Sequence, residues 1–206
     1  MKTTIYIVRH GESEGNVNGD IYGSDPPLTQ IGIDQAVALA EVLLSKPIDI
    51  IYSSNLKRAH HTAQKIADKK KLKVSKTNEL RERFFGKLEG KKRSHAYEKY
   101  PEKYKEFPKL TPSEQLTWKI VDDMETLEEV YKRTIIFLKK ITKIHEGQSV
   151  LFVTHAHLML SLLTYLGFAT FDQLPYGSIK NTGYIKIESN NNNHVIAEVF
   201  GITKTP

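Results

Sequence analysis

Two arginines and two histidines in this sequence form a set that could hold and transfer a phosphoryl group. Arg9 with His10, Arg58, and His155 each follow a short apolar segment closely. An arginine guanidinium stays charged at any working pH and offers a planar fork of donors to phosphate oxygens. A histidine ring can serve near pH 7 as a nucleophile, a cation or a proton carrier. Such a set suits phosphoryl transfer from an oxygen to a ring nitrogen, and one carboxylic acid would complete it by protonating the departing oxygen.

The apolar segments that precede these residues are typical of strands in a parallel sheet. They are continuous and rich in β-branched side chains, which suits strands buried on both faces. They cover residues 4–8, 48–52 and 150–153. Parallel sheets bind ligands just beyond the carboxyl ends of their strands. We therefore expect Arg9, His10, Arg58 and His155 to converge on one cleft.

Helical patterns lie between the expected strands. Apolar side chains repeat at helical spacing over residues 33–45, 56–67 and 127–144. Thr126 and Glu129 form a capping box at the start of the last of these segments. The alternation of strands and helices predicts an α/β fold, a three-layer α/β/α arrangement with a mostly parallel central sheet.

The remaining segments add a hairpin and an insertion. Residues 182–188 and 195–200 alternate apolar and polar side chains across a run of Asn, which predicts a C-terminal hairpin. Residues 86–124 are irregular and rich in Lys, Tyr and Pro, and we interpret them as a helical insertion, or lid, over the C-terminal edge of the sheet. The length favours a single domain over residues 1–206.

Five segments of the sequence form an ordered series of motifs. The first is Arg9-His10-Gly11-Glu12-Ser13-Glu14-Gly15-Asn16. The others are Leu28-Thr29-Gln30-Ile31-Gly32 with Gln35-Ala36, Ser53-Ser54-Asn55-Leu56-Lys57-Arg58-Ala59 with Thr62-Ala63, Leu80-Arg81-Glu82-Arg83-Phe84-Phe85-Gly86 with Leu88-Glu89-Gly90, and Val153-Thr154-His155. In type and order the series resembles the signature of the histidine phosphatase superfamily, the phosphoglycerate mutase-like group.

This resemblance implies a role for each chemistry-bearing residue. His10 is the expected nucleophile and becomes a phosphohistidine, with its other ring nitrogen donating to a backbone carbonyl. Arg9, Arg58 and His155 would bind the transferred phosphoryl group. Glu82 would act as general acid toward the leaving oxygen and then as base for an incoming water.

The resemblance also implies substrate contacts and the absence of a cofactor. The residues expected to contact the substrate or line the site are Asn16, Tyr22, Gly23, Arg83 and Ala156. No metal is expected, because guanidinium and imidazole groups already supply positive charge. Ala156 stands where the family usually has Gly, and whether its methyl group fits depends on the backbone angle φ.

Several residues compete with these candidates. Glu79 and Glu89 lie close to Glu82 in sequence, and the register against Leu80 and Gly86 favours Glu82. His155 and His157 could form a metal pair, but no carboxylate at a suitable spacing supports it, and His157 is expected at a helix start or rim. His60 and His61 are adjacent to Arg58 on a predicted helix and are expected on its solvated face.

The composition limits the class of protein. Apolar residues make up 39% of the chain, Lys and Arg exceed Asp and Glu by 30 to 24, and there is no cysteine. No segment approaches the roughly 18 uninterrupted apolar residues of a membrane span, and the start of the chain lacks the core of a signal peptide. We expect no disulfides, no Cys-ligated metal, no membrane partner and a cytoplasmic location.

A basic run, residues 57–76, carries eight Lys or Arg and one acid, Asp68. It could attract phosphates or nucleic acid, or it could be a solvated helix face. The second interpretation is favoured because no nucleic-acid-binding signature accompanies the run, and no nucleic acid partner is expected.

The leading functional hypothesis is a cofactor-independent phosphomonoesterase acting on a small phosphorylated metabolite. The alternative enzyme is a phosphoglycerate mutase, which must return the phosphate to another hydroxyl. Family mutases usually carry a basic pair in their insertion, whereas this insertion offers Arg93 and Lys109 without paired arginines. A non-catalytic binder of phosphorylated ligands is a third hypothesis, and either a monomer or a homodimer is compatible with the sequence.

Overall fold

The computed structural model describes residues 1–21, 25–190 and 193–205. One six-stranded sheet has the strand order β3-β2-β4-β1-β5-β6. Its strands are β1 (Thr3–Arg9), β2 (Ile50–Ser54), β3 (Val74–Thr77), β4 (Ser149–Thr154), β5 (Ile179–Asn190) and β6 (Asn193–Ile202). The strands β3, β2, β4 and β1 pair in parallel, and β5 and β6 add an antiparallel hairpin beside β1.

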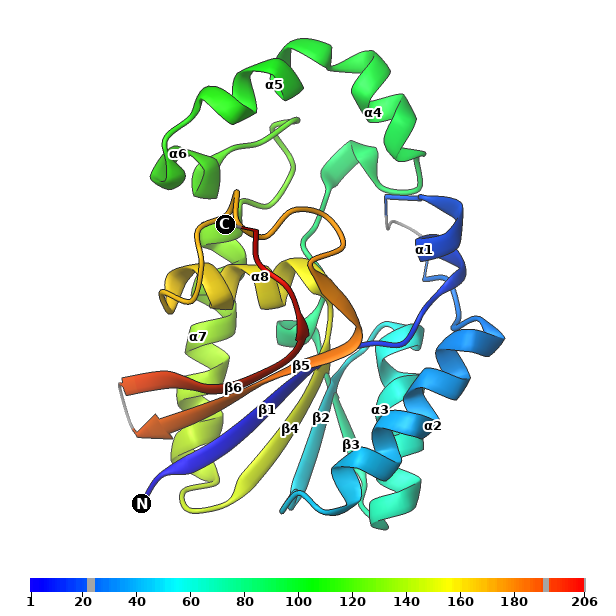
Figure 1. Ribbon diagram of the computed structural model, residues 1–206, viewed down its shortest axis with the longest axis vertical. Helices are drawn as coiled ribbons and strands as arrows, with labels where there is room; N and C mark the ends of the chain where they lie inside the picture. Colours follow the sequence, from blue (N-terminus) through cyan, green and yellow to red (C-terminus); the bar gives the residue numbers. More distant parts are fainter. Residues whose placement is uncertain (22–24, 191–192, 206) are drawn as a thin grey trace.

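Helices cover both faces of this sheet and give three layers (Figure 1). On one face, α2 (Gln30–Leu44) and α3 (Lys57–Lys70) bury Leu39, Leu43 and Ile66 against side chains of β1, β2 and β4. On the other face, α7 (Leu127–Ile144) and α8 (Ala156–Tyr165) bury Leu138 and Leu162 against the opposite side of the same strands. Because each central strand is buried on both sides, its sequence is continuously apolar.

The strand register places the functional segments side by side. Arg9 at the end of β1 pairs with Thr154 at the end of β4, and Ser53 near the end of β2 pairs with Val153. The short helix α1 (Glu14–Asn18), α3 and α8 all begin just beyond these strand ends. Residues that are far apart in the sequence therefore meet at one edge of the sheet.

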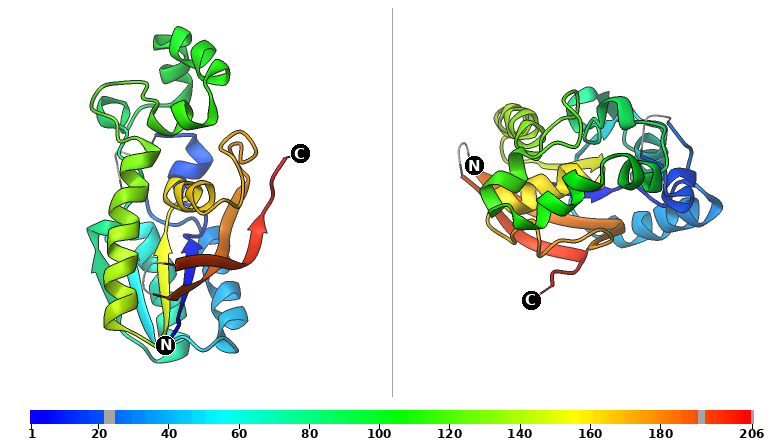
Figure 2. Two further views of the ribbon diagram at one scale, coloured as in Figure 1. Left: turned by 90° about the vertical axis from the view of Figure 1, so that its left-hand side faces the viewer. Right: turned by 90° about the horizontal axis from the view of Figure 1, so that it is seen from above.

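The segment between β3 and α7 forms the lid above this edge (Figures 1 and 2). It contains α4 (Arg93–Lys99), α5 (Pro101–Glu106), α6 (Pro112–Thr117) and the short 3-10 helices η1 (Asn78–Leu80), η2 (Gly86–Leu88) and η3 (Phe107–Lys109). It has a small core of its own around Leu88, Ala96 and Met124. The predicted α/β architecture, the helical insertion and the C-terminal hairpin are confirmed.

Some element boundaries differ from the sequence predictions for local reasons. The helix expected from residue 33 begins at Gln30, because the Thr29 side chain accepts the Gly32 N–H and caps it. The helix expected over 56–67 continues to Lys70 and ends where Lys71 adopts a left-handed φ of 57°. Strand β3 and the extent of helix α8 were not predicted: the first is short and half-exposed, and the second is mostly apolar and carries no Lys, Arg, Asp or Glu to mark a solvated face.

No helix within the described residues is long and apolar enough to span a membrane. The basic run lies mostly on the exposed side of α3 and in the turn after it. Within this run, Lys69 pairs with Glu41 at 2.5 Å. Arg58 differs from the exposed lysines of the run, because it is fully buried and turns toward the edge of the sheet. This arrangement fits the solvated-face interpretation of the run.

Candidate active site

His10 lies directly after β1 and is 1% exposed. Its backbone N–H donates to the Thr154 carbonyl at 3.0 Å, and its Nδ1 lies 2.6 Å from the Gly11 carbonyl oxygen. A carbonyl can only accept, so Nδ1 carries the proton and Nε2 keeps its lone pair. Arg58 Nε donates to that Nε2 at 3.2 Å. The backbone contact expected for the second ring nitrogen is thus present, and Nε2 is the unprotonated ring nitrogen that faces Arg58.

Both buried histidine rings are held in the neutral form. Burial, followed by the charges of Arg58 and Arg9, lowers the pKa of His10 well below its usual value. Burial and Arg58 lower the pKa of His155 in the same way. The two ring centroids are 5.1 Å apart and their planes are inclined by 61°. The pocket therefore combines fixed guanidinium charges with an imidazole able to attack an electrophile.

The loop that carries His10 rests on the first turn of α2. A Cβ atom added at Gly11 would lie 2.3 Å from the Gly32 carbonyl oxygen, and one added at Gly32 would lie 1.9 Å from the Glu12 carbonyl oxygen. The two backbones can approach this closely only because both residues are glycines. Thr29 Oγ1 donates to the Glu12 carboxylate at 2.8 Å and closes the contact. These contacts explain why the motif around Gly32 accompanies the motif around His10.

Thr62 connects the two phosphate-binding segments. Its Oγ1 accepts the Gly11 N–H at 3.0 Å and donates to the Arg58 carbonyl at 2.8 Å. Since Thr62 is fully buried on α3, it fixes the position of Arg58 relative to the His10 loop. Thr62 belongs to one of the five sequence motifs, but its residue type alone indicated no role.

Glu82 is 7% exposed and sits at the amino end of α8. Its Oε1 accepts the backbone N–H groups of Arg83 at 2.9 Å and His157 at 3.1 Å, and its Oε2 lies 3.4 Å from His157 Nδ1. Burial by itself raises the pKa of this carboxyl, but His157, the Arg83 N–H and Arg58 outweigh burial and lower the pKa to about 2. In the unliganded protein Glu82 is a carboxylate at neutral pH.

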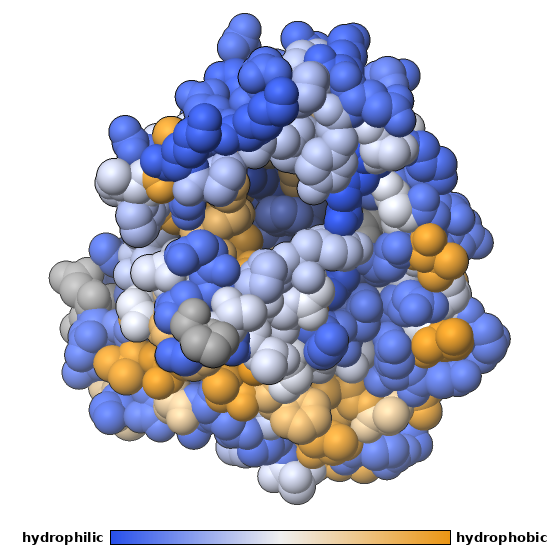
Figure 3. Space-filling model, turned by 45° about the horizontal axis from the view of Figure 1, so that its top comes forward, coloured by the Kyte–Doolittle hydropathy of each residue, from blue (hydrophilic) through white to orange (hydrophobic). Residues whose placement is uncertain are grey.

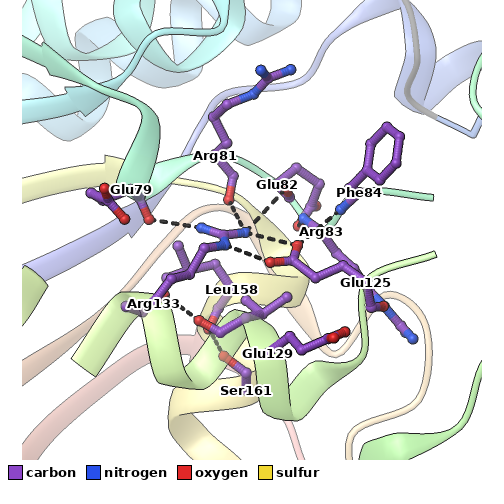
Figure 4. A network of polar contacts seen from close by, with 12 residues as sticks. Glu79, Arg81, Glu82, Arg83, Phe84, Glu125, Glu129, Arg133, Leu158 and Ser161 are labelled. Carbon is purple, nitrogen blue, oxygen red and sulfur yellow. Dashed lines mark hydrogen bonds and ion pairs between the residues drawn. The ribbon is translucent and has the colours of Figure 1, made fainter. Parts of the chain in front are cut away.

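Arg133 of α7 hydrogen-bonds the backbone of the segment that carries Glu82 (Figure 4). Its guanidinium donates to the backbone carbonyls of Glu79 at 2.7 Å, Arg81 at 2.9 Å and Glu82 at 3.3 Å. It also pairs with the Glu125 carboxylate at 2.7 Å. Glu125 in turn accepts the Phe84 N–H at 3.1 Å. We call Arg133 and Glu125 together the Arg133 clamp; nothing in the sequence pattern of α7 distinguished it.

Some of the other expected site residues line one cavity, and two lie outside the described part of the chain. Arg9, Asn16, Arg83 and Ala156 line a cavity that also borders Glu82. Arg83 donates to the Glu125 and Trp118 carbonyls at 2.6 and 3.0 Å, so it ties the lid to the site. Ala156 is the first residue of α8 and is not among the residues with positive φ, so its methyl group causes no backbone strain. The remaining two, Tyr22 and Gly23, lie outside the described residues.

The competing residues lie in different surroundings. Glu79 is exposed, and Glu89 accepts the Phe85 N–H at 3.2 Å beside a neighbouring cavity. His60 lies 3.4 Å from Ser53 Oγ, and His61 is exposed. Of the three candidate glutamates, only Glu82 is buried.

His155 and His157 lie at the start of helix α8 and not on a strand. Strand β4 ends at Thr154, His155 caps α8, and His157 is the second residue of that helix. His157 therefore lies at the rim, as expected, but it contacts Glu82 rather than solvent alone. Within the described residues there is no group of three or more His, Cys, Asp or Glu that could hold a metal ion.

Two residues of β5, Asn181 and Thr182, hydrogen-bond the backbone of His10. The sequence pattern did not predict this contact. Asn181 Nδ2 donates to the His10 carbonyl at 3.0 Å, and the Thr182 N–H approaches the same oxygen at 3.4 Å. Thr182 has a φ of 58°, a strained conformation for a β-branched residue. Strain of this kind is typical of functional sites, and here it aims a backbone N–H at the loop that carries His10.

Comparison with known proteins agrees with this geometry. A family model described as the histidine phosphatase superfamily (branch 1) matches residues 5–200. Phosphoserine phosphatase 1 of Hydrogenobacter thermophilus is 36% identical over 152 residues, which cover 73% of this chain and 70% of that protein. Phosphoglycerate mutase-like protein 4 of Arabidopsis thaliana is 38% identical over 161 residues, which cover 77% of this chain and 68% of that protein. Among solved structures, YhfR of Bacillus stearothermophilus has a TM-score of 0.84 and 28% identity, with 98% of each chain covered.

Proposed function

Because this chain belongs to the histidine phosphatase superfamily (branch 1), we propose that it is a cofactor-independent phosphomonoesterase acting on small phosphate esters through a phosphohistidine on His10. The observation that carries the proposal is the neutral His10, whose free Nε2 lies 3.2 Å from Arg58 Nε in a buried cationic pocket. The similarity to a protein named phosphoserine phosphatase supports hydrolysis as the reaction class.

In the first step, His10 Nε2 attacks phosphorus and the bond from phosphorus to the ester oxygen breaks. Arg9 and Arg58 stabilise the negative charge on the equatorial oxygens, and their positions are fixed before the reaction, which lowers its barrier. Arg9 is oriented by donation to the Ile179 carbonyl, and Arg58 by Thr62 through its own backbone. His155, beside His10, contributes a neutral ring to the same wall.

Glu82 supplies the proton for the leaving oxygen. Its pKa of about 2 in the unliganded protein means that it must gain a proton when the ester binds. A bound phosphate dianion brings like charge next to the carboxylate and raises its pKa, and an ester bound as the monoanion supplies the proton itself. In the second step Glu82 removes a proton from water, the resulting hydroxide attacks the phosphohistidine, and phosphate and neutral His10 are released.

The experiment is a screen of small phosphate esters for release of inorganic phosphate. The variant His10→Ala should lose turnover by about a thousandfold or more, because the nucleophile is gone. The matched control His61→Ala changes an exposed ring three residues after Arg58 and should keep wild-type activity. Near-normal turnover in His10→Ala would mean that another residue is the nucleophile.

Phosphoglycerate mutase is the second candidate, favoured by the relative named mutase-like. A mutase must return the phosphoryl group to a hydroxyl, so 3-phosphoglycerate would be isomerised in the presence of 2,3-bisphosphoglycerate. Running this assay beside the ester screen separates the two enzymes. A protein that binds these esters but turns over none of them would be a non-catalytic binder.

A further inference from the structure

A cavity of about 300 Å³ lies between the lid and the phosphate-binding residues. One end reaches Arg9, Glu82 and Ala156, so the alcohol portion of an ester bound at His10 would extend into it. Figure 3 shows the molecule hollowed below the lid, with hydrophobic residues along one wall of the hollow. We call this space the lid cavity.

The walls of the lid cavity are unusually aromatic. They include seven aromatic side chains, Phe85, Tyr97, Tyr104, Phe107, Trp118, Phe171 and Tyr176. Several of these rings already pack on one another: Tyr97 on Tyr104 at 4.0 Å, and Phe107 on both Trp118 at 4.7 Å and Phe171 at 5.1 Å between centroids. Aromatic walls favour a flat apolar ligand that can stack or meet a ring edge.

Three charged residues of the same walls, Asp20, Arg83 and Arg93, already contact other parts of the protein. Arg83 donates to two backbone carbonyls of the lid, as described above. Asp20 pairs with Lys92 at 2.8 Å, and the Arg93 guanidinium lies 3.7 Å from the centroid of the Tyr176 ring. A substrate ammonium group would have to displace Lys92 from Asp20, and a substrate carboxylate would meet the guanidinium of Arg93, which is already stacked on Tyr176. Most of the remaining wall is aromatic and solvates neither charge.

We propose that the preferred substrates are phosphate monoesters whose alcohol portion carries an aromatic ring, rather than phosphoserine or phosphoglycerate. This inference rests on the proposed phosphatase function, because it assigns the lid cavity to the leaving alcohol. The ring would lie among Phe107, Trp118 and Tyr104, with its phosphate against Arg9 and Arg58.

The central comparison uses two esters whose leaving alcohols have similar basicity, so that chemistry does not mask binding. Propyl phosphate and 3-phenylpropyl phosphate differ by the ring alone, and phosphoserine and 3-phosphoglycerate represent charged alcohols. We expect kcat/KM for 3-phenylpropyl phosphate to exceed that for each of the other three by about tenfold or more, chiefly through a lower KM. A higher kcat/KM for phosphoserine or 3-phosphoglycerate would overturn the inference and leave the phosphatase function standing.

Two matched variants test whether the aromatic wall of the lid cavity causes the preference for an aromatic substrate. Phe107→Leu removes a ring from the wall and should reduce the ratio of kcat/KM between 3-phenylpropyl and propyl phosphate by about fivefold or more. Phe200→Leu makes the same change at an exposed position on β6, where the ring stacks on Tyr184, and should leave the ratio unchanged. An unchanged ratio in Phe107→Leu would place the ring of the substrate elsewhere.

A binding measurement keeps the inference testable if no ester is hydrolysed. Calorimetric titration of His10→Ala with propyl and 3-phenylpropyl phosphate reports the affinity of the cavity without turnover. Tighter binding of 3-phenylpropyl phosphate by about tenfold would support the aromatic cavity even if the proposed hydrolysis failed. Equal affinities would reject the inference, whatever the outcome of the ester screen.

Discussion

At the scale of single residues, this site separates two acid–base groups by their surroundings. His10 is kept neutral by burial and neighbouring guanidinium groups, whereas Glu82 is kept ionised by His157 and the backbone N–H of Arg83. A neutral imidazole can attack phosphorus, and a carboxylate that gains a proton only with the ester couples leaving-group protonation to binding. His10 is thus already in the state that the first step requires, whereas Glu82 reaches its protonated state only when the ester binds.

Replacing Glu82 by Gln tests its assigned role. For alkyl phosphates, whose alkoxide needs a proton to depart, kcat should fall by about a hundredfold or more. For p-nitrophenyl phosphate, whose phenolate departs unprotonated, the loss should be below about tenfold. Steady-state rates on both substrates provide the comparison.

The control for this prediction is Glu79→Gln, the same change at an exposed carboxylate three residues earlier. It should alter neither rate. Equal losses on the two esters in Glu82→Gln would assign the proton donor to another group, with Glu89 the next candidate.

At the scale of elements, the position of Glu82 depends on helix α7. Glu82 lies before the helices of the lid in the sequence, and α7 lies after them. The 3-10 turn η1 leads into an irregular segment, and a backbone without ladder hydrogen bonds needs other partners for its carbonyls. Arg133 of α7 supplies them, and Thr154 Oγ1 at the end of β4 donates to the Leu80 carbonyl at 2.8 Å. The segment that carries Glu82 is therefore positioned by α7 and β4 together.

Replacing Arg133 by Met should loosen this segment without touching the substrate. Because Glu125 loses its partner and three carbonyls lose a donor, we expect the free energy of unfolding to fall by about 1–3 kcal/mol. Misplacement of Glu82 should also lower kcat for alkyl phosphates about tenfold more than for p-nitrophenyl phosphate. Denaturant unfolding and paired rate measurements check the two effects.

Lys132→Met is the matched control, because Lys132 is exposed on α7 and pairs with Glu128 one turn earlier. It should leave both the stability and the leaving-group dependence within error. Arg133→Lys, which keeps a charge for Glu125 but cannot reach three carbonyls at once, should recover only part of the loss. A uniform loss on both esters in Arg133→Met would indicate a structural role alone.

At the scale of the whole molecule, the buried charges of the site are coupled to folding. The folded pKa of Glu82, about 2, lies below the value of a glutamate in the unfolded chain. A lowered folded pKa contributes stability that is fully present above the unfolded pKa, about 4.3, and is lost as pH falls toward the folded pKa. Acid should therefore destabilise the protein through this group in the window between those two values.

The expected contribution of Glu82 is about 3 kcal/mol across that window. Urea unfolding at a series of pH values should show a steeper fall in the free energy of unfolding for the wild type than for Glu82→Gln. Parallel pH profiles for the two proteins would mean that the carboxyl has the same pKa in the folded and unfolded states. Glu79→Gln again serves as the control, since Glu79 is exposed.

The central strands and the meeting of the candidate site residues could be predicted from the local sequence. Continuous apolar segments next to polar clusters identified β1, β2 and β4, because strands buried on both faces have no polar side to interrupt the pattern. The strand ends then predicted that Arg9, Arg58 and His155 meet His10, since parallel strands present their carboxyl ends at one edge. The hydrogen bond from Arg58 to His10 and the neighbouring rings of His10 and His155 agree with this prediction.

Only the tertiary structure decided the supporting contacts. Arg133, Thr62 and Asn181 act through hydrogen bonds to backbone groups distant in sequence, and a backbone acceptor leaves no trace in residue type. The aromatic walls of the lid cavity come from α4 to α6 and from the loop after α8, which are brought together by packing and share no periodicity. The sequence alone thus determined which residues are candidates for the chemistry, and the fold decided how they are held and what surrounds them.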